Sequence, residues 1–139
     1  MAYSAEFSRA IAVSLFIHIK MEEYQYEYIS TKIMAEHLMI PAPTVVRILK
    51  NLNASGITIA KEGTKGGYIL ARSISEITLL DVFLAIERGP MFKTHGGLDI
   101  EYPEIERVTG VVKNCLLDAE HSMKGSLKKT TLADIFNST

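Results

Sequence analysis

Residues 40–71, IPAPTVVRILKNLNASGITIAKEGTKGGYILA, decide the fold of this chain. The two prolines near the start cannot lie inside a helix, but Pro43 suits the first turn of one. The spacing of the apolar residues that follow predicts a helix from Pro43 to about Asn53, and Gly56 is placed to end it. The apolar face of this helix has the spacing i, i+3, i+4 and i+7 and consists of Val45, Ile48, Leu49 and Leu52.

A second short helix precedes this one. Ser30 is a typical N-cap residue, and we expect a helix over Thr31–Met39 whose buried side carries Ile33, Met34 and Leu38. Two short helices joined by a tight turn, the second with a basic outer face, form the outline of a helix-turn-helix.

The hydrophobic period changes after the second helix. Residues 57–60 and 68–71 are short runs rich in β-forming residues, and the loop between them contains Gly63, Gly66 and Gly67. This pattern predicts a β-hairpin, and a hairpin directly after a helix-turn-helix is a wing. The fold class we expect is therefore mostly α with one small β-hairpin, a winged helix-turn-helix.

Further helices are expected on both sides of this motif. Residues 6–20 are apolar on most sides, which indicates a helix packed in the middle of the domain. Thr78 begins a capping box for a helix that continues to about Glu87. Thr131 starts a final short helix that ends near Phe136.

The longest helical pattern lies over residues 104–129. Its apolar residues recur at spacings of three and four, close to the 3.5-residue period of two packed helices. These residues are Ile105, Val108, Val112, Cys115, Ala119, Met123 and Leu127. A long one-sided helix needs a partner, and the residues of this seam from Ile105 to Met123 are the candidates for such a contact. The expected organisation is a winged DNA-binding domain over 1–88, an irregular loop over 89–103, and the dimerisation and closing helices over 104–139.

Positive charge is concentrated in the helix-turn-helix and the hairpin. Residues 41–72 carry five basic side chains and one acidic one, a net charge of +4, whereas the whole chain has a net charge of −1. A globally cationic nucleic-acid binder is thereby excluded, but a local basic patch is not. The candidate DNA-contacting residues are Pro43, Thr44, Arg47, Lys50, Asn51, Lys61, Lys65, Gly66 and Gly67.

These assignments have alternatives. The charges could form an ordinary solvated helix face, and Arg47 could donate to a guanine or to a phosphate. We expect Lys65 to contact a phosphate or the minor groove rather than a specific base. Gly66 and Gly67 would let the hairpin approach DNA closely, although turn geometry alone could account for them.

No motif in the sequence indicates catalysis or a metal site. His18, His37, His95 and His121 lack the paired spacing of metal ligands. The glycine loop lies between strands rather than before a helix, where phosphate-binding loops lie. A single cysteine, Cys115, excludes an internal disulfide and a cysteine-rich zinc or iron–sulfur site. No run of about 18 apolar residues is present, so we do not expect a membrane protein. The missing motifs predict a protein that is not an enzyme and has no cofactor. The single cysteine favours the reducing cytoplasm.

The chain resembles the Rrf-two family of bacterial transcriptional regulators, the family of IscR, NsrR and CymR. The resemblance rests on Ile40–Leu52 with Gly56-Ile57, on Gly63–Ala71, on Ile77–Val82 and on Thr131–Ile135, in that order along the chain. It implies a winged helix-turn-helix dimer that binds palindromic operator DNA, here expected to be a repressor. It also implies that the long C-terminal helix crosses that of the partner.

The chain departs from the family pattern in three places. Many members have three cysteines before the long helix that bind an iron–sulfur cluster, but residues 91–103 contain none, so we expect no cluster. The hairpin commonly begins with an arginine that reaches the minor groove, whereas Glu62 stands here. The start of the recognition helix is usually polar, whereas this chain has Pro41, Pro43 and Val46. The operator sequence therefore cannot be inferred from relatives.

The effector and the partner class stay open at this point. Cys115 is either a small buried hydrophobe or a redox switch at the dimer interface. His95 is the best candidate for a ligand contact in the loop, so the effector could be a small molecule or an oxidant. The alternative function is a winged-helix protein-interaction module that does not recognise DNA specifically, which Glu62, Pro43 and Val46 would permit.

Overall fold

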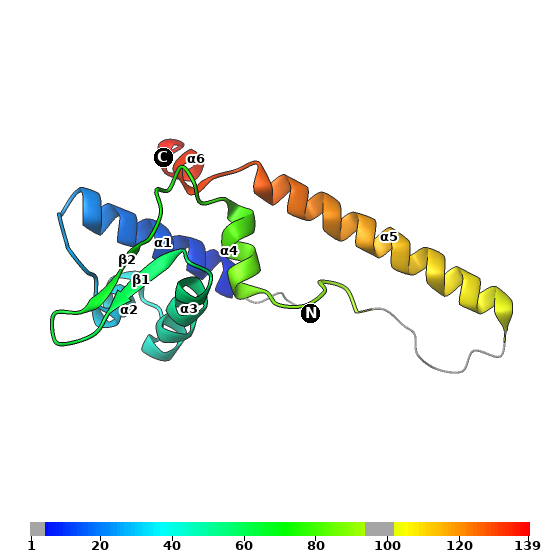
Figure 1. Cartoon of the computed structure of the whole chain (residues 1–139), viewed down its shortest axis with the longest axis horizontal. Coiled ribbons are helices and arrows are strands. Elements are labelled where there is room, and N and C mark those ends of the chain that lie inside the picture. The colour runs from blue at the N-terminus through cyan, green and yellow to red at the C-terminus, as the bar shows by residue number, and fades with distance from the viewer. Residues whose placement is uncertain (1–4, 94–101) are drawn as a thin grey trace.

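The computed structural model describes residues 5–93 and 102–139 and contains the expected elements in the expected order (Figure 1). Its helices and strands are α1 Glu6–Glu22, α2 Thr31–Leu38, α3 Ala42–Ala54, β1 Thr58–Lys61, β2 Gly67–Leu70, α4 Leu79–Ile86, α5 Pro103–Lys128 and α6 Leu132–Asn137. The described chain is mostly helical with a two-stranded antiparallel sheet, which confirms the predicted fold class. The boundaries differ slightly from the predicted ones; α1, for example, continues past Lys20 to Glu22.

Side-chain caps determine where α2, α4 and α6 begin. The Ser30 hydroxyl accepts a backbone N–H of the first turn of α2 at 3.2 Å. Thr78 and Asp81 form the predicted reciprocal capping box on α4, with N···O distances of 3.1 and 3.0 Å. Thr131 and Asp134 form the same box on α6, at 3.0 and 2.9 Å. Each cap satisfies backbone N–H groups that the start of a helix otherwise leaves unpaired.

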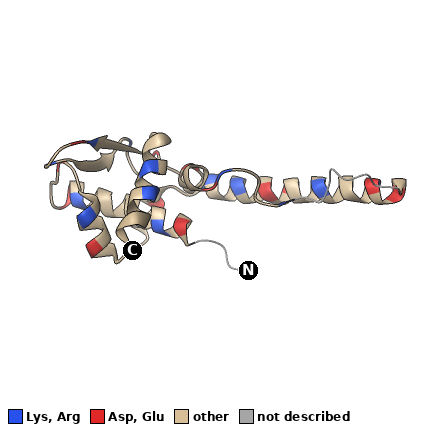
Figure 2. Cartoon of the chain, turned by 90° about the horizontal axis from the view of Figure 1, so that it is seen from below, with Lys and Arg blue, Asp and Glu red and all other residues tan. Residues whose placement is uncertain are grey.

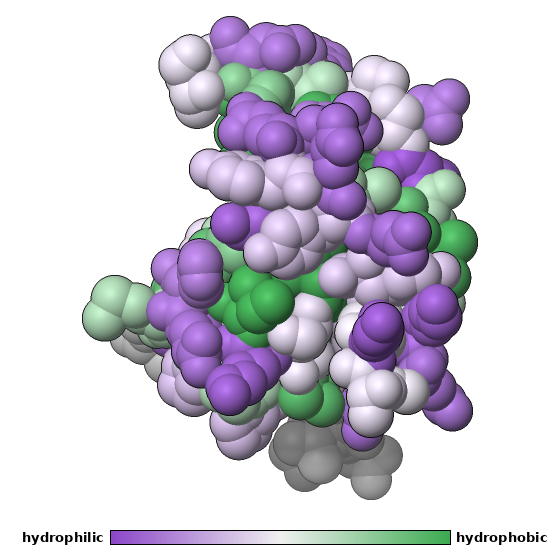
Figure 3. Space-filling model, turned by 90° about the vertical axis from the view of Figure 1, so that its left-hand side faces the viewer, coloured by the Kyte–Doolittle hydropathy of each residue, from purple (hydrophilic) through white to green (hydrophobic). Residues whose placement is uncertain are grey.

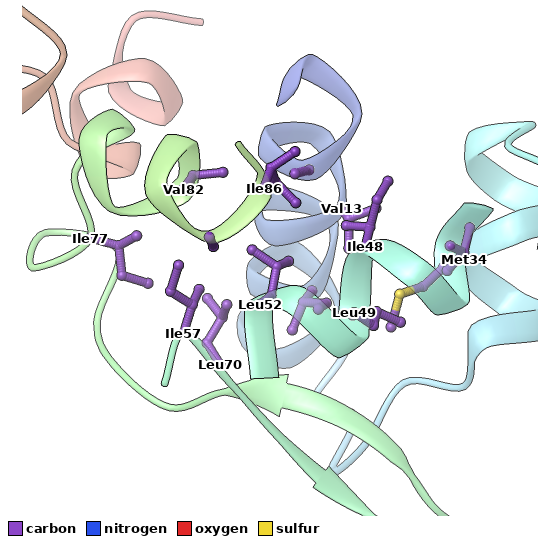
Figure 4. Close-up of a cluster of buried hydrophobic side chains, with 14 of the residues drawn as sticks. Val13, Met34, Ile48, Leu49, Leu52, Ile57, Leu70, Ile77, Val82 and Ile86 are labelled. Atoms are coloured by element: carbon purple, nitrogen blue, oxygen red, sulfur yellow. The ribbon is translucent and has the colours of Figure 1, made fainter. Parts of the chain in front are cut away.

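The core lies where α1, α3 and α4 pack together (Figure 4). The predicted apolar face of α3 is completely buried. Each of its four side chains has an exposed fraction of 0%: Val45, Ile48, Leu49 and Leu52. Around this face lie buried apolar residues of α1, the hairpin region and α4, namely Ala10, Val13, Ile17, Ile57, Leu70, Val82 and Ile86. Burial of one such side chain stabilises a fold by roughly 1.5–3 kcal/mol. The stripe on α3 is therefore sufficient to hold this helix in one orientation.

The hairpin is joined to the segment that precedes α2. In the antiparallel pair of β1 and β2, Lys61 lies opposite Gly67. Tyr68 of β2 also exchanges two backbone hydrogen bonds with Ile29, at 3.0 and 2.8 Å. This close approach requires a glycine at position 67, because a Cβ there would overlap the carbonyl oxygen of Ile29. The contact with Ile29 therefore requires glycine at position 67, independently of any contact with DNA.

After α5 the chain returns to the winged domain (Figure 1). Three backbone hydrogen bonds secure the return. Leu79 N–H donates to the Thr130 carbonyl at 2.8 Å, Leu132 N–H donates to the Ile77 carbonyl at 2.9 Å, and Ala133 N–H donates to the Ile74 carbonyl at 3.1 Å. Leu132 is fully buried in the same core as the α3 stripe. The closing helix α6 therefore packs on the winged domain, and α5 is the element that projects from it.

We expect Gly67→Ala to destabilise the protein, because the new Cβ would collide with the backbone of Ile29. The free energy of unfolding, measured by urea denaturation, should fall by at least ~1 kcal/mol. Gly63→Ala is the matched control, since Gly63 also has a positive φ, +110°, but has nothing within 4 Å of its Cβ position. An equal loss of stability in the two variants would show that the contact with Ile29 is not what requires glycine.

Candidate nucleic-acid interface

The side of α3 opposite its buried stripe faces solvent. Arg47 and Lys50 lie on this side and are exposed, and Pro43 is exposed at its start. Thr44 and Asn51 lie on its flank and are half-buried. Because the other side of α3 is packed into the core, the predicted contact residues of this helix lie at the surface.

The hairpin carries two further cations. Lys61 ends β1 and Lys65 lies in the connecting loop, and both are exposed. The Lys61 ammonium lies 5.2 Å from the centre of the Tyr28 ring, a cation–π contact. Gly66 N–H donates to the Gly63 carbonyl at 3.0 Å, and a Cβ at Gly66 would overlap the Lys61 carbonyl oxygen. Turn geometry is therefore sufficient to require glycine at position 66.

Charged residues of both signs lie on the winged domain and on α5 (Figure 2). Within the winged domain, the exposed cations Arg47, Lys50, Lys61 and Lys65 lie on α3 and the hairpin. The end of the molecule that bears α2 and the hairpin is largely hydrophilic, with small apolar patches (Figure 3). A hydrophilic and locally basic surface suits a polyanion better than an apolar partner.

Two cations of the predicted basic patch form ion pairs within the chain. Arg47 donates from Nε and Nη2 to one carboxylate oxygen of Glu6 at the start of α1, at 2.7 and 2.5 Å. Arg72 donates at 3.2 Å to Asp81, the residue that also caps α4. Sequence reasoning missed the first pair because its partners are 41 residues apart. The patch in the folded protein is therefore less positive than the residue count suggests.

The predicted dimerisation seam on α5 is largely exposed. The helix has 26 residues and none of them is buried. Ile105, Val108 and Val112 are 51%, 57% and 48% exposed, and Cys115 and Ala119 are exposed as well. Large apolar side chains gathered on one face of an exposed helix are typical of an interaction surface.

The C-terminal end of the seam has a different environment. Met123 and Leu127 are half-buried and, with Phe7 of α1 and Phe83 of α4, line a cavity of about 340 Å³. The two phenyl rings pack edge to face with their centroids 5.3 Å apart. Within the single chain, Met123 thus faces the winged domain. Sequence reasoning also did not single out Val111, which is 62% exposed on α5.

The residues predicted to sense an effector are placed in part. Cys115 is a free, exposed thiol on α5, so the single chain does not bury it as a small hydrophobe. His95 lies outside the described residues.

Within residues 5–93 and 102–139, no three His, Cys, Asp or Glu side chains come together as a set of metal ligands. None of the described helices combines the length and hydrophobicity of a membrane span.

A helix-turn-helix followed directly by a hairpin, with a basic face on its second helix, defines the class of winged helix-turn-helix DNA-binding regulators. The model of the Rrf2 family, described as an iron-dependent transcriptional regulator, matches residues 5–138. The chain therefore belongs to the Rrf2 family, which confirms the resemblance predicted from its motifs.

Known relatives and structures agree with this class. The chain is 29% identical over 112 residues to the HTH-type transcriptional regulator YffB of Lactococcus lactis, across 76% of this chain and 70% of that protein. It is 35% identical over 98 residues to the HTH-type transcriptional regulator Rv1287 of Mycobacterium tuberculosis, across 69% of this chain and 58% of that protein. IscR of T. potens shares the fold with a TM-score of 0.65 at 22% identity, over 99% of this chain and 88% of that one. CymR of B. subtilis does so with a TM-score of 0.65 at 20% identity, over 100% and 98%.

The family description names iron, but the residues of this chain do not fit an iron–sulfur site. Such clusters are bound chiefly by cysteine thiolates. This chain has one cysteine, and it lies exposed on α5. The described His, Cys, Asp and Glu residues supply no substitute set of ligands. The described residues therefore do not provide the ligands that an iron–sulfur cluster needs.

Proposed function

We propose that this protein is a homodimeric transcriptional repressor that binds a palindromic DNA operator. The observation that carries the proposal is the exposed face of α3 with Arg47 and Lys50, opposite a stripe that is completely buried. In a winged helix-turn-helix bound to DNA, this helix lies in the major groove. Lys61 and Lys65 of the hairpin would then contact phosphates or the minor groove. We favour repression because occupancy of an operator is sufficient to exclude other proteins from that DNA.

The apolar face of α5 supports the homodimer. A helix of 26 residues is about 39 Å long, and the described residues of the same chain leave Ile105, Val108 and Val112 about half exposed. A second copy offers an identical face, and two such helices that cross at a two-fold axis would cover each other. A two-fold dimer presents two copies of α3 to DNA, which suits half-sites about 34 Å apart. This symmetry is the reason to expect a palindrome.

We also propose that regulation proceeds without an iron–sulfur cluster. One route is oxidation of Cys115, whose lone thiol could react with the same residue of a second subunit or with a small thiol. The other route is a small molecule in the cavity beside Phe7, Phe83 and Met123, which is apolar and within the size range of ligand sites.

A protein-interaction module is the second candidate function. Glu62 is exposed on the hairpin and puts a negative charge beside the hairpin lysines, and the exposed Pro43 adds an apolar residue at the start of α3. Such a module would show neither a specific DNA site nor a steep dependence of DNA binding on salt.

DNA binding separates these two functions. Binding to fragmented genomic DNA is measured at two salt concentrations. A regulator should select a specific fragment, and its affinity should fall steeply as the salt concentration rises. Arg47→Ala should weaken binding to that fragment by ~1–3 kcal/mol, and Lys65→Ala should weaken binding to all DNA alike and reduce the salt slope by about 1. Lys113→Ala on α5 removes the same charge away from α3 and should change neither. Unchanged affinity in the first two variants, with the fold intact, would contradict the assignment of α3 as the recognition helix.

We expect Val112→Asp to convert the dimer into a monomer, because it would place an unpaired carboxylate in the interface. Sedimentation velocity at micromolar concentration measures the change. Asn114→Asp adds the same charge on nearly the opposite side of α5 and should remain dimeric. A wild-type protein that sediments as a monomer under these conditions would rule the homodimer out.

Protein purified without oxygen should be colourless, because a set of cysteine ligands for an iron–sulfur cluster is missing. DNA binding should also survive treatment with chelators. If an oxidant alters DNA binding, Cys115→Ser should abolish the response; a retained response would exclude the thiol. A brown anaerobic preparation with stoichiometric iron and sulfide would show that the protein does hold a cluster.

A further inference from the structure

The ion pair of Arg47 with Glu6 involves the side chain that the proposed function places nearest to the DNA bases. Nε–H and one N–H of Nη2 both donate to Glu6 Oε1, at 2.7 and 2.5 Å. Glu6 lies in the first turn of α1, and α1 packs against α3 (Figure 1). The Glu6 side chain is 17% exposed and the Arg47 side chain is 58% exposed. The carboxylate is thus held against the protein while the guanidinium extends into solvent.

The two hydrogen bonds use only one edge of the guanidinium. An arginine side chain has five N–H groups arranged in a planar fork. With the Nε–Nη2 edge bonded to Glu6, the terminal edge, formed by Nη1 and the second N–H of Nη2, is left to donate two parallel hydrogen bonds. Two parallel donors match the O6 and N7 acceptors that guanine presents in the major groove.

The same pair changes what Arg47 contributes to DNA binding. Phosphate contacts depend on net positive charge, and the Glu6 carboxylate offsets the charge of Arg47, so a paired arginine is a weaker phosphate ligand than a free one. Its hydrogen-bond geometry is retained, however, and its side chain is already ordered. Less conformational entropy is therefore lost when the terminal edge binds a base.

We propose that Glu6 is a positioning residue that determines sequence specificity: it holds Arg47 so that the terminal edge of the guanidinium binds a guanine rather than a phosphate. This inference rests on the proposed function, because it requires α3 to lie in the major groove. An ion pair whose guanidinium is more than half exposed contributes little to folding, so the role of Glu6 should be visible in DNA recognition more than in stability.

The test compares wild type, Glu6→Ala, Arg47→Ala and the double variant by fluorescence anisotropy. Alanine removes the acceptor, whereas a glutamine oxygen would still accept both hydrogen bonds of Arg47. Each protein is titrated with a duplex from the selected genomic fragment and with a shuffled duplex, and the ratio of the two Kd values gives the specificity. Glu6→Ala should reduce this ratio about tenfold, while affinity for the shuffled duplex stays equal or rises because a negative charge is lost. In the Arg47→Ala background, Glu6→Ala should leave the ratio unchanged. Glu22→Ala, the same change at the other end of α1, should also leave the ratio unchanged.

Arginine side-chain NMR provides a measurement without DNA. The Nε–H of Arg47 should be protected from exchange in wild type and lose protection in Glu6→Ala, at an unchanged urea midpoint. Tighter specific binding by Glu6→Ala, an unchanged specificity ratio, or an equal effect with and without Arg47 would each overturn the inference. A wild type that selects no fragment would refute the proposed function itself. Loss of specific binding in Arg47→Ala beside an unaffected Glu6→Ala would refute only the role of Glu6.

Discussion

The burial of one apolar stripe on α3, between Val45 and Leu52, governs the rest of this structure. The four side chains of the stripe are removed from water by the surrounding elements α1, α2, α4 and β1, and together they stabilise the fold by several kcal/mol. An α-helix has a fixed period, so burial of these positions turns Arg47 and Lys50 outward. The exposed basic face of α3 is thus a geometric consequence of the core, and the same packing that stabilises the domain orients its candidate interface.

Backbone contacts then attach the remaining functional elements to this core. The hairpin is held by the two hydrogen bonds between Ile29 and Tyr68, so its cations keep a defined position relative to α3. The helix α5 is attached through its C-terminal half, where Met123 packs toward α4 and Glu120 accepts the Met91 N–H at 2.5 Å. Its N-terminal half carries the exposed apolar residues around Val108. One helix therefore combines an intramolecular contact surface with an exposed apolar face, which the proposed homodimer would cover.

Electrostatics in the winged domain favour selectivity over general attraction. The ion pairs of Arg47 and Arg72 reduce the free positive charge of the basic patch, and Glu62 adds a negative charge on the hairpin. Since non-specific DNA affinity follows net charge, the operator binding that we propose would depend more strongly on the geometry of base contacts. The chain also has one cysteine in a family described as iron-dependent, so the regulation that we propose proceeds through Cys115 or through the cavity beside Phe83.

The amino-acid sequence by itself determined the elements, their order and the family. The cap at Ser30, the capping box at Thr78 and the apolar spacing of α3 are interactions between residues a few positions apart, so they can be recognised without knowledge of the fold. Only the tertiary structure decided that Arg47 pairs with Glu6, that Gly67 approaches the backbone before α2, and that Met123 faces its own winged domain. These contacts join residues far apart in the chain, and they depend on the angles and distances at which whole helices pack, which no local pattern encodes.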